Sequence, residues 1–130
     1  MKRSNEKPEI YKKLKKRFGV KWNDGLIITY GDTTYSKERI HRIKYVHEKV
    51  HSKRQLRMGV EDWWDKYLKD KDFRLNEELL AYRKEVEWIY KQGIDKDFRT
   101  AVIEGMAQDL SSKMYGEIIS YEDALRAITE

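Results

Sequence analysis

The sequence contains no cysteine, a single proline and only three histidines. The absence of cysteine excludes disulfides and thiolate ligands, so any metal ion must be held by histidine and carboxylate side chains. No apolar run is long enough to cross a membrane. The basic segment 1–17 has neither the apolar stretch nor the small-residue cleavage site of a signal peptide. We therefore expect a cytoplasmic protein with no membrane partner.

Apolar and charged residues are equally frequent in this chain of 130 residues, at 39% each. This composition suits one modest core inside a heavily charged surface, and we expect a single domain spanning residues 1–130. The net charge is +5, with much of the excess near the N-terminus. A solvated basic helix explains that excess better than a nucleic-acid partner, which stays possible but is not favoured.

The N-terminal part of the chain predicts a helix followed by strands. Ile10, Leu14 and Phe18 lie four residues apart, and Gly19 suits the end of a helix, so residues 1–19 predict a basic amphipathic helix.

Residues 26–30 and 33–35 are rich in β-branched and aromatic side chains, and Gly31-Asp32 between them is typical of a two-residue hairpin. Residues 20–22 are a candidate third strand.

Helical periodicity dominates the rest of the sequence. Ser36 is a candidate N-cap for the first of these helices, and Gly93 and Gly116 suit helix ends. The predicted helices cover about residues 37–55, 60–73, 76–92, 96–115 and a final stretch capped by Ser120. We expect an α+β fold in which a small antiparallel β-sheet packs on the helix that begins near residue 37. Residues 20–92 would form the core around that helix, and residues 94–130 would form C-terminal helices.

A His-Glu-x-x-His pattern lies within the predicted helix 37–55, as His47-Glu48-Lys49-Val50-His51. On a helix, residues four apart lie only about 40° apart around the axis, so both imidazoles can face one ion. Glu48 lies about 100° from His47, where it is better placed to reach a water on the metal than the metal itself. The pattern therefore predicts two metal ligands and a general base on one rigid element.

A catalytic zinc site commonly has three protein ligands. His41 lies upstream on the same helix but is rotated by about 120° from His47, which disfavours a shared ion. Glu77 and Glu78 open the predicted helix 76–92. Glu78 flanks the apolar stripe of that helix, whereas Glu77 points nearly opposite to it, so Glu78 is the better third ligand. The alternative is that both are acids of a first turn that stabilise the helix N-terminus.

Three segments resemble the small phage and bacterial metallopeptidases of the gluzincin kind, also called minigluzincins. They are His47–His51, the aromatic segment from Trp63 to Leu68, and the segment from Phe73 to Tyr82. Proteins of this kind take their third ligand from a Glu shortly before an Ala-Tyr pair on a second helix, and the Glu three residues before Ala81 is Glu78. The resemblance covers about residues 25–90. Lys49 departs from it, because a bulky apolar residue is usual there.

The resemblance implies a zincin-like fold and a Zn²⁺-dependent peptidase, phage-encoded and acting in the bacterial host. His47, His51 and Glu78 would hold the zinc, Glu48 would act as general base, and a peptide or protein would be the substrate. An edge strand commonly receives the substrate in such proteins, and residues 33–35 are a candidate. Trp63, Trp64 and Tyr67 are more consistent with core than with a substrate pocket. The alternative is a non-catalytic, zinc-stabilised protein whose basic surface binds nucleic acid or an acidic protein.

Overall fold

The computed structural model describes residues 1–23 and 25–130. Within these ranges the chain forms a three-stranded sheet and six α-helices, an α+β arrangement as expected. The strands are β1 (Lys2–Ser4), β2 (Ile27–Tyr30) and β3 (Thr33–Ser36). The helices are α1 (Ile10–Phe18), α2 (Arg42–Met58), α3 (Val60–Lys69), α4 (Lys71–Lys91), α5 (Lys96–Leu110) and α6 (Tyr121–Thr129), with a short 3-10 helix η1 (Lys113–Tyr115).

The predicted hairpin is confirmed, but the sheet around it differs from the prediction. β2 and β3 pair in antiparallel fashion across a turn in which Gly31 has a φ of 64°, as primed hairpin turns require. The third strand is β1, not residues 20–22, and it pairs with β3 in parallel, so the sheet is mixed rather than antiparallel. The Lys-Arg-Ser sequence of β1 has no alternation of apolar and polar residues, since the strand pairs through its backbone. Such a strand cannot be predicted from the sequence pattern.

The helix that carries the two histidines begins later than predicted. Ser36 is the last residue of β3, where its Oγ donates to the carbonyl oxygen of Glu38, so it does not cap a helix. The N-cap is His41, whose Nδ1 accepts the backbone N–H of Ile43 at 3.2 Å. The helix then continues to Met58 and ends at Gly59, which has a φ of 105°.

α4 begins before residue 76, where the sequence placed its start. The Asp70 side chain accepts the backbone N–H groups of Asp72 and Phe73, which caps the helix and sets its first residue at Lys71. As a result, Glu77 and Glu78 lie about two turns inside the helix rather than in its first turn. α5 ends at Leu110 rather than near residue 115.

Two predicted caps are confirmed. α1 ends at Gly19, which has a φ of 70°, and the Ser120 hydroxyl caps α6 by accepting the backbone N–H of Asp123. In the described ranges, no helix combines the length and apolarity that a membrane span would require.

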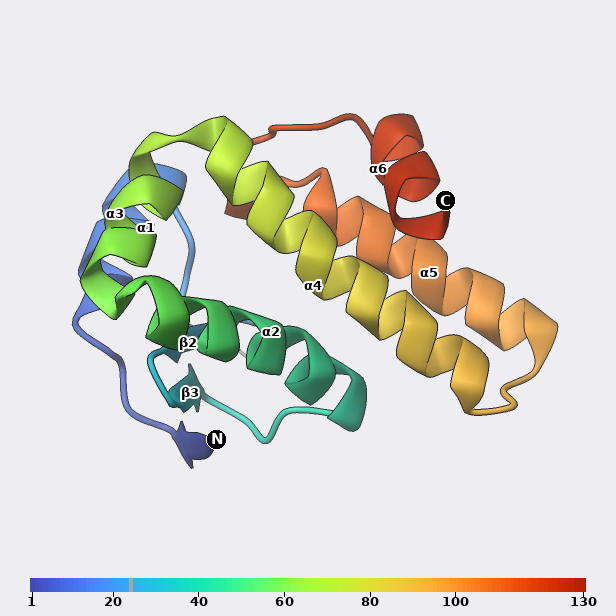
Figure 1. Cartoon of the computed structure of the whole chain (residues 1–130), viewed down its shortest axis with the longest axis horizontal. Coiled ribbons are helices and arrows are strands. Elements are labelled where there is room, and N and C mark those ends of the chain that lie inside the picture. Colours follow the sequence, from blue (N-terminus) through green and yellow to red (C-terminus); the bar gives the residue numbers. More distant parts are fainter. Residues whose placement is uncertain (24) are drawn as a thin grey trace.

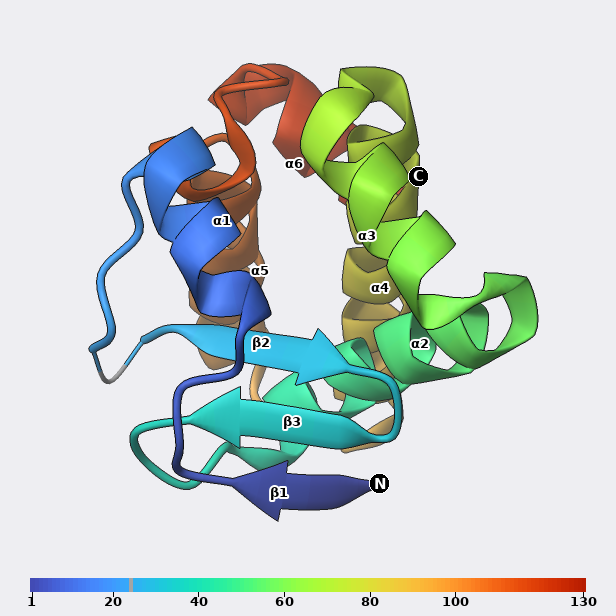
Figure 2. The same ribbon diagram turned by 90° about the vertical axis from the view of Figure 1, so that its left-hand side faces the viewer.

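α2 is the central helix of the architecture. It packs against β2 on one side and against α4 and α3 on others, while α5 and α6 pack on α4 (Figure 1). Figure 2 shows the three strands side by side, with α1 above β2. Tyr82, Leu110 and Trp63 are among the most deeply buried side chains of the core. α2 and α4 pack directly against each other, so some of their residues face each other in the interior.

Side chains of α2 also fasten the hairpin. The Ser52 hydroxyl donates to the carbonyl oxygen of Gly31 at 2.7 Å. The Gln55 amide accepts the backbone N–H of Gly31 at 2.7 Å and donates to the carbonyl oxygen of Thr29 at 2.8 Å. Because all of these groups are buried, the position of β2 relative to α2 is well determined.

Candidate metal centre

His47 and His51 of α2 meet Glu78 of α4 in the interior of the protein. The Nε2 atom of His47 lies 3.0 Å from Nε2 of His51 and 3.0 Å from Oε1 of Glu78. The third side of this triangle, from Nε2 of His51 to Oε1 of Glu78, measures 3.3 Å. All three residues are buried, and their ligand-type atoms lie within 4.8 Å of one another.

These separations suit a small divalent ion. Two ligands about 2.0–2.1 Å from a tetrahedral ion lie about 3.3 Å from each other. The observed sides of 3.0 to 3.3 Å are close to that spacing. If both imidazoles carry their proton on Nδ1, as metal ligands bound through Nε2 do, their Nε2 lone pairs face each other at 3.0 Å and a cation between them is accommodated. The buried His-His-Glu group can therefore hold a metal ion.

Tyr67 orients the Glu78 carboxylate. Its hydroxyl donates to Oε2 of Glu78 at 2.7 Å. Oε1 of Glu78 contacts both histidines, and Oε2 also lies 3.2 Å from Nε2 of His51. Burial raises the pKa of Tyr67 well above its usual value, so the hydroxyl stays a donor. Tyr67, like Trp63 and Trp64, is buried in the core as expected, but it also supports the ligand group, which the sequence did not reveal.

Glu85 supports His47 from the other side of its ring. Nδ1 of His47 lies 2.6 Å from Oε1 of Glu85, which is completely buried on α4. Lys44 of α2 reaches the same carboxylate oxygen at 3.5 Å. A carboxylate at Nδ1 fixes which imidazole nitrogen carries a proton and turns Nε2 toward the ligand group. Glu85 follows Glu78 by seven residues, two turns along the same face, and that spacing is the signal that could have identified it.

The charges of this cluster depend on one another. Burial lowers the pKa of His47, but the carboxylates of Glu48, Glu78 and Glu85 raise it by more, to about 10. Burial raises the pKa of the Glu78 carboxyl, but the two imidazoles lower it by more, to well below its usual range. Without a metal, these shifts favour a protonated His47 beside an ionised Glu78.

Glu48 lies beside the ligand group, outside its triangle. Its Oε1 accepts a hydrogen bond from the Thr29 hydroxyl at 2.9 Å, and its Oε2 lies 3.8 Å from Nε2 of His47. Burial raises the pKa of Glu48, the histidines lower it, and the nearby Glu78 raises it further. Thr29 belongs to β2, so the strand next to α2 positions this carboxylate. The motif gave no indication of that partner.

The prediction for the orientation of Glu77 is wrong. Glu77 is completely buried, and its Oε1 accepts hydrogen bonds from Nε1 of Trp63 and Nε of Arg54, both at 2.7 Å. The reason is that α4 packs against both α2 and α3, so its buried surface is wider than one apolar stripe. The alternative of two first-turn acids is also excluded, because the helix begins at Lys71.

Other aromatic and histidine side chains of the neighbouring elements lie outside the ligand group. His41 is the N-cap of α2 and is not one of the residues that group as possible metal ligands. The Tyr82 ring packs against the His47 ring with centroids 4.5 Å apart, but its hydroxyl pairs with the Tyr115 hydroxyl at 2.8 Å.

A small inner cavity of about 50 Å³ reaches His47 and Glu48. Its lining residues Ile27, Lys44 and Met114 also line an outer cleft of about 610 Å³, formed with the segment before β2 and the segment between β3 and α2. The outer cleft and the inner cavity therefore share part of their wall. A second inner cavity of about 50 Å³ is lined by His47, Glu48, His51 and Glu78 together. The strand at the outer cleft is β2, which is at the edge of the sheet; β3 is central, so residues 33–35 are not a free edge as predicted.

Comparisons with protein-family models, curated proteins and solved structures find no match to this chain. The assignment of a function therefore depends on the residues of the site themselves.

Proposed function

We propose that this protein is a zinc-dependent peptidase, with His47, His51 and Glu78 as metal ligands and Glu48 as general base. Two imidazoles and one carboxylate, in a protein without thiols, are a ligand set that zinc accepts. The observation that carries the proposal is the position of Glu48. The Glu48 carboxylate is buried, and its Oε2 lies 3.8 Å from Nε2 of His47. Its Oε1 accepts a hydrogen bond from Thr29, so a residue outside the ligand group orients it.

The number of ligands favours a catalytic site over a structural one. Structural zinc sites are usually closed by four protein ligands, whereas catalytic sites have three and keep one position for water or substrate. Three ligand-type residues group together in the described part of the chain. When bound, zinc would acidify a water molecule and polarise a peptide carbonyl.

The protein's own contribution is the handling of a proton at Glu48. Thr29 occupies Oε1, so Oε2 is the oxygen that accepts a proton from the attacking water. Burial raises the pKa of Glu48, which makes the carboxylate a stronger base and lets its protonated form donate to the leaving nitrogen. Glu85 keeps the proton of His47 on Nδ1, away from the reacting side.

The outer cleft suits an extended peptide. Ile27 of the edge strand β2 lines this cleft, and an edge strand can bind a peptide backbone by adding it as a further strand. Lys44 and Asp109 line the same cleft and supply charged groups at its inner end.

One observation favours a second function. His47 and Glu78 are each only 2% exposed, a degree of burial that also suits a zinc ion with a purely structural role. The chain would then be a non-catalytic binding protein whose basic surface contacts an anionic partner.

The variant Glu48→Gln separates these functions. It keeps the size of the side chain but removes the base, so a peptidase should lose cleavage of a peptide library by about 100-fold or more while still binding one zinc. Glu61→Gln, on the exposed first turn of α3, is the matched control and should cleave normally. Cleavage that is undiminished in Glu48→Gln would exclude Glu48 as the base. A parent protein that binds zinc and cleaves nothing across the library would favour the structural function.

A further inference from the structure

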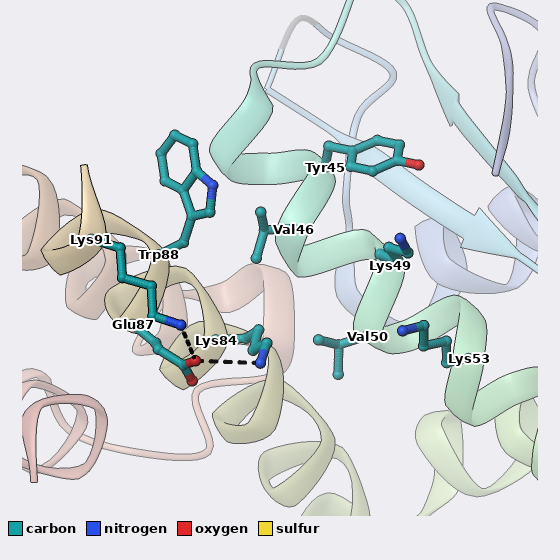
Figure 3. A pocket seen from close by; sticks show the side chains of 9 residues that line it. All are labelled: Tyr45, Val46, Lys49, Val50, Lys53, Lys84, Glu87, Trp88 and Lys91. Atoms are coloured by element: carbon teal, nitrogen blue, oxygen red, sulfur yellow. Dashed lines mark hydrogen bonds and ion pairs between the residues drawn. The ribbon is translucent and has the colours of Figure 1, made fainter.

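A second concave site lies between α2 and α4, apart from the metal centre. It is a groove of about 320 Å³, the lower end of the range for ligand pockets. Val46 and Val50 point from α2 toward α4, and Trp88 of α4 completes an apolar floor (Figure 3). All three side chains are only partly buried, so this floor is accessible from solvent.

Lysines border this floor on both helices. Lys49 and Lys53 come from α2, and Lys84 and Lys91 come from α4. The only acidic residue of the lining is Glu87, which already pairs with Lys84 at 3.5 Å and Lys91 at 3.1 Å. The groove therefore has four ammonium groups against a single carboxylate.

Lys49 and Lys53, the two lysines that α2 contributes to the groove, have no acidic partner in the described part of the chain. Lys49 lies over the Tyr45 ring with its Nζ 6.0 Å from the centroid. Lys53 follows four residues later on the same face, and like charges at this spacing destabilise a helix slightly. An anionic group bound between them would remove that repulsion. Lys49 is also the residue at which the motif departs from its usual apolar character, and here it borders the groove rather than the metal centre.

We propose that this groove binds an acidic amphipathic peptide segment of a partner protein. Apolar side chains of the segment would pack on Val46, Val50 and Trp88, and its carboxylates would pair with the lysines at the border. A groove between two helices with an apolar floor is a common way to bind an amphipathic helix. The proposal does not depend on peptidase activity.

A peptide fits this groove better than a nucleic acid does. Single-stranded nucleic acid is usually bound by stacking its bases on several exposed aromatic rings. The lining here has two aromatic rings, the partly buried Trp88 and the exposed Tyr45, and Lys49 already lies over the Tyr45 ring. The border has no arginine, the residue best suited to bidentate phosphate binding. The aliphatic floor instead matches leucine or isoleucine side chains.

The test uses a fluorescently labelled helical peptide in which leucines alternate in helical register with glutamates. Its binding is followed by anisotropy and by backbone amide shifts in the NMR spectrum. We expect shifts confined to α2 and α4, and a loss of affinity of at least about tenfold for Lys49→Glu/Lys53→Glu. Lys12→Glu/Lys16→Glu is the matched control, because these exposed lysines of α1 have the same spacing and the same charge change; we expect less than about a twofold effect.

Two further comparisons can overturn the proposal. Val46→Thr/Val50→Thr keeps the side-chain shape but makes the floor polar, and it should weaken binding severalfold, as should replacing the peptide's leucines by serine. Equal losses in both lysine pairs, or no effect of the polar floor, would show non-specific charge attraction and overturn a built groove. Single-stranded DNA that binds more tightly than the peptide, and loses affinity with Lys49→Glu/Lys53→Glu, would assign the groove to nucleic acid instead.

Discussion

Nδ1 of His47 lies 2.6 Å from Oε1 of Glu85, so this imidazole is held between two carboxylates, Glu85 on one ring nitrogen and Glu78 on the other. Such a partner orients a ligand histidine and makes it more basic, and its loss typically costs about 10–100-fold in metal affinity. We therefore expect Glu85→Gln to weaken zinc binding by about tenfold or more in a competition titration with a coloured chelator. Glu87→Gln, two residues along the same helix but exposed, should bind as the parent does. Equal affinities for all three proteins would mean that Glu85 does not support the ligand.

Glu77 and Glu78 are neighbours with different partners, so their variants should have different effects on zinc binding and stability. Glu78→Ala removes a ligand-type oxygen and should abolish stoichiometric zinc uptake, as should His47→Ala and His51→Ala. Glu77→Ala should keep one zinc but lower the free energy of unfolding by about 1–3 kcal/mol, because it leaves the buried indole N–H of Trp63 without a partner. Metal analysis and urea unfolding of each variant check both parts. Loss of zinc in Glu77→Ala with retention in Glu78→Ala would reverse the assignment.

Zinc binding should release a proton at neutral pH. His47 in the metal-free protein has a pKa of about 10, above the pH, so its imidazole is protonated, and a protonated imidazole cannot be a ligand. Because the proton must leave, apparent affinity should rise by about tenfold per pH unit as the pH increases toward that value. Calorimetry in two buffers of different ionisation enthalpy should give different heats at pH 7.5, corresponding to about one proton per zinc. Identical heats in the two buffers would show that His47 is neutral before zinc arrives.

The sequence was sufficient for the parts of the site that local periodicity determines. His47 and His51 share a helix face because they lie four residues apart, and this spacing survives any error in where the helix begins. Glu78 was placed on the correct side of α4 even though the helix starts five residues earlier than predicted, because its angle to Tyr82 does not depend on the cap.

Features that depend on contacts between two helices or strands could not be predicted from the sequence. Glu77 was placed nearly opposite the apolar stripe of its helix because a single stripe was assumed. Only the packing of α3 and α2 on α4 shows why a carboxylate is buried there. Thr29 and Tyr67 contact the site from a strand and from another helix. β1 was missed because three polar residues pair through their backbones alone. Whether such groups meet is decided by tertiary contacts that no single segment encodes.

The Gln55 side chain limits how β2 can bind anything else. In a two-residue hairpin the residues flanking the turn exchange hydrogen bonds, so the backbone groups of Thr29 and Ile27 face away from β3. Gln55 donates to the carbonyl oxygen of Thr29, and its amide thus stands in for a neighbouring peptide unit. An incoming strand can pair with Ile27 but not beyond it. The amide that holds the hairpin therefore blocks strand addition at Thr29, which would limit an added peptide to one register along β2.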